Sequence, residues 1–169
     1  MRLIILIITL LLARSAIAQG PKPVDCEASP ERRQFDFWLG EWEVTDKAGD
    51  RVLGNNTISR REGGCYLFEA WRSAGGGSGS SMNYYDPQIG KWHQLWLDAG
   101  YSIISTTGGI VDGSMVMTGS IHYLDAGTTH PFRGTWTPMP DGRVRQFFEQ
   151  GDDAGKWQVW FEGFYRKVE

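Results

Sequence analysis

Aromatic and polar side chains alternate with other residues in several short segments of this chain. In KWHQLWLD, residues 91–98, the positions Trp92, Gln94, Trp96 and Asp98 are two apart. Because successive side chains of a β-strand point to opposite sides, these four residues share one face. An apolar wall that carries a few placed amide or carboxyl groups is typical of a site for a small molecule. The segment therefore predicts one wall of a ligand-binding lumen.

Other segments repeat this mixture and complete the candidate site. Each of them places an aromatic, amide, carboxyl or guanidinium group on one face of an expected strand. The further candidates are Glu69 and Trp71 in CYLFEAW, Asn83 and Tyr85 in SMNYYD, Arg133 in FRGTW and Gln146 in RVRQFFE.

Two alternatives to a ligand site stay open for the same residues. Small barrels are often filled by their own side chains, and Glu69 or Asp98 would then pair with Arg133 or Arg145 in a buried network. Alternatively, Glu69 and Asp98 form a carboxylate pair for acid–base catalysis. The sequence offers no nucleophile–base pair, so it favours binding over an enzyme activity.

The chain from residue 43 onward is typical of strands joined by tight turns. About ten short strands recur every 8–12 residues or so, and no helical period interrupts them. This rhythm predicts an all-β fold, a single antiparallel up-and-down barrel of about ten strands. The one helical signal precedes it in SPERRQFDF, where Ser29 is placed to cap a short helix and Pro30 to occupy its first position.

The segment FDFWLGEWEV, residues 35–44, concentrates aromatic bulk around Gly40. Its Gly-Glu-Trp resembles the Gly-x-Trp pattern that opens the first strand of lipocalins and their relatives, the calycins. The resemblance implies that Trp42 belongs to a barrel floor. It also implies that Arg166, in EGFYRK of the last strand, lies across Trp42 in a cation–π contact.

A longer pattern runs through nearly the whole chain after residue 35. FDFWLGEW, GGCYLFEAW, GSSMNYYDPQIGKWHQLWLD, RGTWTPMPDGRVRQFFEQ and KWQVWFEGFYR together resemble an exported bacterial family catalogued as a domain of unknown function. That family is grouped with lipocalin-like barrels. The resemblance implies the fold and an exported location, and it brings no activity or ligand.

Histidines bear on the possible cofactors. His93, His122 and His130 are far apart in the sequence and lack metal-ligand spacing, so no protein-built metal site is expected. Some calycin-like barrels, the nitrobindins, bind haem through a histidine on the barrel wall. By that resemblance, His122 or His130 would be the haem ligand here, and otherwise no cofactor is expected.

The N-terminus and the two cysteines indicate the compartment. Residues 1–18 have an early arginine, an apolar run and the ending Ala-Ile-Ala, which together predict a signal peptide. Residues 19–34 then form a lead-in with the short helix, and residues 35–169 form the barrel domain. Export to the periplasm or the extracellular space favours a disulfide between Cys26 and Cys65.

The charge of the chain limits its partners. A net charge of −3 without a basic stripe argues against nucleic acid and against an anionic membrane surface. We therefore expect a monomer whose partner is a small molecule.

Overall fold

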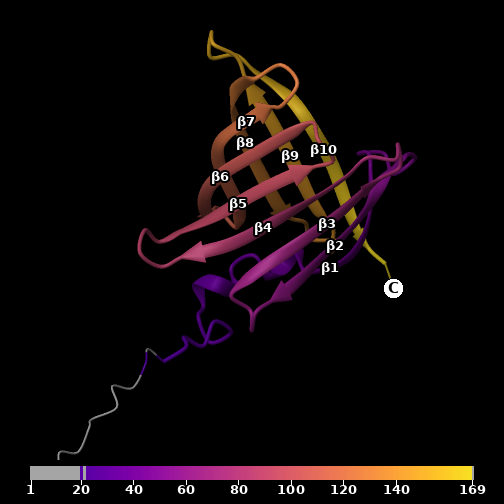
Figure 1. Cartoon of the computed structure of the whole chain (residues 1–169). Coiled ribbons are helices and arrows are strands. Elements are labelled where there is room, and N and C mark those ends of the chain that lie inside the picture. The colour runs from indigo at the N-terminus through magenta and orange to yellow at the C-terminus, as the bar shows by residue number, and fades with distance from the viewer. Residues whose placement is uncertain (1–19, 21, 169) are drawn as a thin grey trace, which may run out of the picture.

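The computed structural model describes residue 20 and residues 22–168, so the predicted signal peptide lies outside the described residues. Its strands form one closed antiparallel barrel (Figure 1). This confirms the predicted all-β fold. The strands are β1 (Gly40–Thr45), β2 (Val52–Arg61), β3 (Tyr66–Ser73), β4 (Ser78–Asp86), β5 (Lys91–Asp98), β6 (Ser102–Val111), β7 (Ser114–Tyr123), β8 (Thr128–Pro138), β9 (Val144–Gly151) and β10 (Trp157–Lys167).

Each strand pairs with its neighbours in the sequence, and β1 pairs with β10 to close the sheet. In the closing pair Val44 lies opposite Tyr165. This closing pair joins residues 42–45 of β1 to residues 164–167 of β10, so the two end strands of the sheet cover each other there. The register shifts at two places, between Val44 and Thr45 on β1 and between Val159 and Phe161 on β10. The second shift is a bulge at the barrel rim, and it shapes the site described below.

Burial alternates along the strands, and on β3, β4, β5 and β9 the face that carries the candidate residues is the more buried one. On β5, for example, Trp92 and Gln94 are buried, whereas Leu95 between Gln94 and Trp96 is exposed. The prediction for β8 is wrong. Phe132 and Trp136 face inward and are buried, so Arg133 between them points outward.

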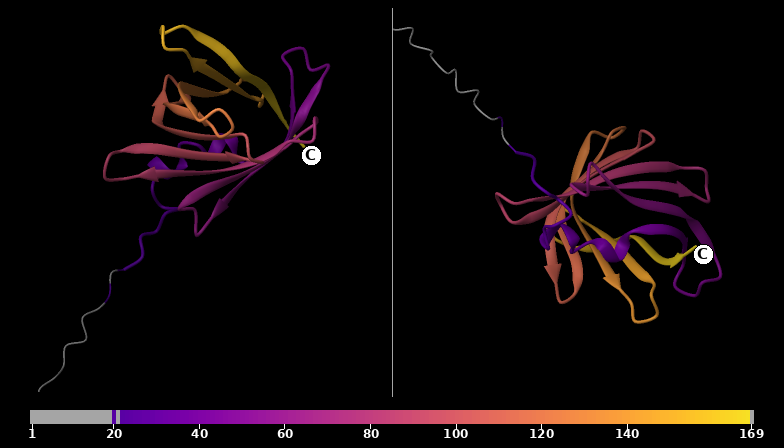
Figure 2. Two further views of the ribbon diagram at one scale, coloured as in Figure 1. Left: turned by 45° about the horizontal axis from the view of Figure 1, so that its top comes forward. Right: turned by 90° about the horizontal axis from the view of Figure 1, so that it is seen from below.

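Two short 3₁₀ helices, η1 (Glu31–Arg33) and η2 (Asp36–Trp38), cross one end of the barrel (Figure 2, right). They are the predicted N-terminal helix, divided into two turns. Ser29 does not cap η1, because its hydroxyl donates to the carboxylate of Glu31. In the part of the chain that the structure describes, no helix is both long and apolar enough to cross a membrane.

Aromatic side chains from the helical segment close this end of the barrel. Phe35 and Trp38 are fully buried and stack with ring centroids 4.9 Å apart. Phe35 also meets Trp92 and Trp136 edge-on, at 5.6 and 5.3 Å. The indole N–H of Trp42 donates to the carbonyl of Trp38 at 2.9 Å, which ties the first strand to the helices. These rings form the barrel floor.

The cation over Trp42 is Lys167 and not Arg166, which corrects the prediction from the lipocalin pattern. The register places Trp42 opposite Lys167, and the Lys167 ammonium lies 5.4 Å from the indole centroid. Arg166 is one residue out of phase, so it points outward and pairs with Glu43. Gly40, at φ +131°, lies against the Lys167 stem, since a Cβ there would lie 3.3 Å from Lys167 Cε.

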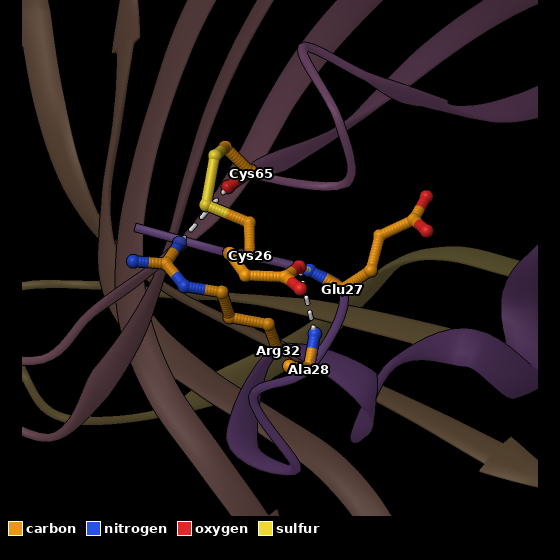
Figure 3. The surroundings of a disulfide bond; sticks show 6 residues. Cys26, Glu27, Ala28, Arg32 and Cys65 are labelled. Atoms are coloured by element: carbon orange, nitrogen blue, oxygen red, sulfur yellow. Dashed lines mark hydrogen bonds between the residues drawn. A yellow bond between two sulfur atoms is a disulfide. The ribbon is translucent and has the colours of Figure 1, made fainter. Parts of the chain in front are cut away.

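The predicted disulfide between Cys26 and Cys65 is present, with Cα atoms 4.9 Å apart (Figure 3). It joins the segment before η1 to the turn between β2 and β3. Beside the disulfide, the Arg32 guanidinium donates a hydrogen bond to the carbonyl of Cys65 at 3.1 Å. Both contacts hold the helical segment against the end of the barrel that it closes.

Replacing both cysteines, Cys26→Ser with Cys65→Ser, should lower the free energy of unfolding by about 3–4 kcal/mol. Without the bond, the unfolded chain regains the conformational entropy that is lost when two residues 39 positions apart are joined. Urea unfolding measures the difference. Reductant should lower the free energy of unfolding of the wild type to that of the variant and leave the variant unchanged. A variant as stable as the oxidised wild type would contradict a stabilising role of the disulfide.

Candidate functional site

The lumen opposite the helical end retains a cavity of about 100 Å³. Its base is polar and its walls are mostly aromatic. The lining residues are Glu69, Trp71, Gln94, Trp96, Ile104, Gln146, Phe148, Trp160, Phe161 and Tyr165.

Buried polar side chains at the base are joined by hydrogen bonds on both sides of Glu69. The amide of Asn56 on β2 donates to Glu69 Oε1 at 2.7 Å, and the hydroxyl of Ser81 on β4 donates to Oε2 at 2.5 Å. Asn56 Nδ2 also donates to the Tyr165 hydroxyl at 3.1 Å, and that hydroxyl donates to Gln146 Oε1. The network therefore links β2, β3, β4, β9 and β10 across the lumen.

The network continues from Ser81 toward β5. Asn83 Nδ2 donates to the Ser81 hydroxyl at 2.8 Å, and Gln94 Nε2 donates to Asn83 Oδ1 at 3.0 Å. Each of these side chains lies on the inner face of its strand and is buried. Asn83 thus lies beneath the cavity and orients Gln94, which lines it.

Glu69 is the only acidic residue among the described side chains that line the cavity. It is 3% exposed, and no arginine, lysine or histidine of the described residues forms an ion pair with it. Burial raises the pKa of Glu69 to about 7, against the opposing effect of the hydrogen bonds from Ser81 and Asn56. Near neutral pH the carboxyl is therefore divided between its protonated and its ionised forms.

Three aromatic rings of the walls lie where a neighbouring strand has a glycine. At Gly79 an added Cβ would lie 2.3 Å from Cζ2 of the Trp96 ring. A glycine inside a strand is unfavourable unless another group needs the space, and the ring occupies that space here. The pairs are Trp71 with Gly54, Trp96 with Gly79 and Phe148 with Gly134.

The bulge on β10 brings two consecutive aromatic residues to the cavity. Val159 pairs with Glu149 and Phe161 with Phe148, so Trp160 between them has no partner in the ladder. Adjacent residues of a regular strand point to opposite faces, and a bulge removes this restriction. Trp160 and Phe161 accordingly both line the cavity, and Trp160, at 39% exposure, lies at its mouth.

The structure brings five of the ten predicted ligand-binding residues together at the cavity. Trp92 and Tyr85 lie instead toward the closed end, where the Trp92 indole N–H donates to the carbonyl of Glu31 at 3.2 Å. Asn83 lies just beneath the lining, as described above. The five that line the cavity are Glu69, Trp71, Gln94, Trp96 and Gln146.

Asp98 lies outside the lining and completes the turn between β5 and β6. It accepts hydrogen bonds from the backbone N–H groups of Tyr101 and Ser102 and from the Ser102 hydroxyl. Burial alone would raise the pKa of Asp98, but these hydrogen bonds from Ser102 and Tyr101 hold it below its ordinary value. The structure therefore does not bring Asp98 and Glu69 into one cavity as a catalytic pair.

The predicted arginine partners of Glu69 lie on the outer surface. Arg133 donates two hydrogen bonds to Glu149, at 2.6 and 2.9 Å, and its guanidinium lies 4.3 Å from the Trp157 ring centroid. Arg145 pairs with Glu162 at 2.7 Å. The alternative of a buried network between Glu69 and these arginines is therefore wrong. Neutral side chains donate the hydrogen bonds to the Glu69 carboxyl.

Sequence reasoning missed several residues of the cavity and its base. Two signals could have found some of them. The adjacent aromatics of WQVWFEGFY break the two-residue period, which indicates a bulge. Glycines inside the predicted strands indicate the close approach of another group. The residues missed are Asn56, Ser81, Ile104, Phe148, Trp160, Phe161 and Tyr165.

The cavity does not fit a haem held by His122 or His130. Among the described residues that line it, none is a histidine. His122 hydrogen-bonds to Thr129, and His130 lies within 3.3 Å of the Thr128 hydroxyl. A porphyrin also exceeds the space of about 100 Å³. In the same described part of the chain, no group of three or more His, Cys, Asp or Glu side chains could hold a metal ion.

The buried carboxyl predicts that stability falls as pH rises. The unfolded chain ionises Glu69 near its ordinary pKa of 4.5, whereas the folded chain holds the proton until about pH 7. Between these values the folded state binds more protons, so the contribution of Glu69 to the free energy of unfolding drops by about 3 kcal/mol.

Glu69→Gln removes this titration while keeping an amide of similar shape. Unfolding in urea from pH 4.5 to 8 should show the wild-type stability falling relative to the variant through the window that ends near pH 7. Parallel curves for the two proteins would show that Glu69 titrates normally.

Gly79→Ala should destabilise the barrel by about 1–3 kcal/mol, because the new Cβ collides with the Trp96 ring. Gly77→Ala is the matched control in the preceding turn, where the nearest atom is Ser73 Cβ at 3.8 Å. The control should unfold at or slightly above the wild-type midpoint. Equal midpoints for the two variants would show that the indole does not need this glycine.

A scan against protein-family models finds no match, and a search of the curated proteins finds none either. The closed antiparallel barrel is therefore established from the structure itself.

Proposed function

We propose that this chain is an exported barrel that binds one small molecule non-covalently in its lumen. The ligand has an apolar body about the size of one ring and a polar end. The observation that carries the proposal is a cavity with aromatic walls over a hydrogen-bonded polar base. Pockets that bind small molecules combine an apolar lining with a few placed polar groups in this way.

The size of the cavity sets the size of the ligand. Sites for drug-sized molecules occupy about 300–1,000 Å³. An engineered apolar cavity of about 150 Å³ holds one benzene. The present cavity, at about 100 Å³, suits a single ring, with any further part of the ligand extending toward Trp160 at the mouth.

The base offers both a donor and an acceptor to the polar end. Gln94 uses its amide N–H to bind Asn83, which leaves its carbonyl oxygen without a protein donor among the described residues. Gln146 uses its carbonyl oxygen to accept from Tyr165, which leaves its amide N–H groups without an acceptor in the same part of the chain. A ligand group such as a hydroxyl can satisfy both.

The predicted location belongs to the same proposal. The Cys26–Cys65 disulfide suits an oxidising compartment, and the resemblance to an exported bacterial family of lipocalin-like barrels supports the periplasm or the extracellular space. We propose that the protein acts there as a monomeric binding protein.

Benzyl alcohol is a suitable first probe of the cavity. In a titration followed by NMR, the indole N–H signals of Trp71, Trp96 and Trp160 should shift and saturate, since these rings line the cavity. The signal of Trp157, which lies under Arg133 on the outer face, should not move.

Two variants and one spectrum complete this test. Trp96→Leu should weaken binding, whereas the control Trp157→Leu should not. Native mass spectrometry of the protein purified from its exporting compartment should show a ring-sized adduct that is lost on denaturation. The absence of an adduct, together with unsaturable or unselective shifts, would refute a binding function.

A further inference from the structure

We propose that the cavity selects a small organic cation, a ring-bearing ammonium compound, over its neutral and anionic counterparts, with Glu69 as the counter-ion. This inference rests on the proposed binding function and specifies its ligand class.

The first observation is the lack of a positive partner for Glu69. On the outer surface, Glu149 pairs with Arg133 and Glu162 with Arg145. Glu69 is far more buried than either, yet none of the cationic side chains in the described residues pairs with it. A buried carboxyl without a cation is costly, so its place in the lumen requires an explanation.

The second observation is that every element around the carboxyl presents a neutral group. The one titratable group among them is the Tyr165 hydroxyl, whose pKa is raised well above its usual range by burial and by the nearby Glu69, so it stays protonated. Among the described residues, no cationic group therefore competes with a ligand cation for Glu69. The groups that contact Glu69 or share its cavity are Asn56 from β2, Ser81 from β4, Gln94 from β5, Gln146 from β9 and Tyr165 from β10.

The third observation concerns the hydrogen-bond acceptor positions of the carboxyl that the protein leaves open. Oε1 accepts one protein hydrogen bond, from Asn56, and Oε2 accepts one, from Ser81. An ionised carboxylate can accept about four in all. Glu69 also lines the cavity, so its remaining acceptor positions are available to an N–H group of a ligand there.

The fourth observation is the aromatic composition of the walls. Trp71, Trp96 and Trp160 line the cavity together with two phenylalanines. Aromatic faces attract cations, and tryptophan does so most strongly. A carboxylate at the base and indoles around the walls form a suitable environment for an ammonium group attached to an apolar ring.

Charge balance gives this interaction a measurable signature. Near pH 6 the Glu69 carboxyl carries its proton, because burial raises its pKa to about 7. When a protonated amine binds, the carboxyl ionises, its O–H bond breaks, and the proton passes to the solvent. The product is a carboxylate paired with the ammonium. A neutral ligand leaves the carboxyl protonated and releases nothing.

The experiment compares three molecules that share one ring but differ in charge: benzylamine, benzyl alcohol and benzoate. Calorimetry of the intact protein should give the affinity order benzylamine, benzyl alcohol, benzoate. At pH 6, titrations in two buffers of different ionisation enthalpy should show release of close to one proton per benzylamine and none with benzyl alcohol. Benzylamine affinity should rise about tenfold from pH 6 to pH 8 as Glu69 becomes ionised before binding.

Glu69→Gln tests the residue directly. The variant should lose the preference for benzylamine, so that the ratio of its benzylamine affinity to its benzyl alcohol affinity falls about tenfold or more. Glu149→Gln is the matched control, since it makes the same change on the outer face. Proton release by the wild type provides the same information even if the Glu69 variant folds poorly.

The outcomes separate this inference from the binding function. Equal affinities for benzylamine and benzyl alcohol, or a preference for benzylamine that survives in Glu69→Gln, would overturn the cation selectivity and leave the binding function standing. Failure of all three molecules to bind would overturn both.

Discussion

A closed barrel of ten strands encloses more space than its own alternating side chains readily fill. The interior widens with strand number, and about eight strands give one just wide enough to be packed. This chain meets the constraint with residues from outside the sheet. Phe35 and Trp38 enter from the helical segment, and the Cys26–Cys65 disulfide holds that segment in place. The helical segment therefore fills one end of the lumen, and the other end retains a cavity.

The position of the helical segment also explains why polar residues occupy the middle of the barrel. Aromatic rings fill the lower end, and Glu69, Asn56 and Tyr165 span the lumen above them with hydrogen bonds. The alternative of a barrel filled by its own side chains thus describes the half of the lumen next to the helical segment, and the cavity lies in the other half. Since the network contains a carboxyl but no cation, it keeps the base of the cavity polar without supplying its own counter-charge.

The barrel of about ten strands and the grouping of residues on strand faces could be predicted because they depend on local alternation and turn residues. Features set by pairing between strands could not. Arg166 and Lys167 differ by one residue, and only the register with Trp42 decides which lies over the indole. Arg133 points outward because Phe132 and Trp136 fill the lumen on either side of it. The bulge at Trp160 likewise depends on pairing with β9, although consecutive aromatics gave a local sign of it.

Glu69 is a buried carboxyl at the base of the cavity, and none of the cationic side chains in the described residues pairs with it. The most direct test is a pH titration of the Glu69 side-chain carboxyl by carbon-13 NMR, with and without benzylamine. We expect a midpoint near 7 for the free protein and a clear decrease when benzylamine binds. A midpoint near the ordinary 4.5 that does not change with the amine would contradict it.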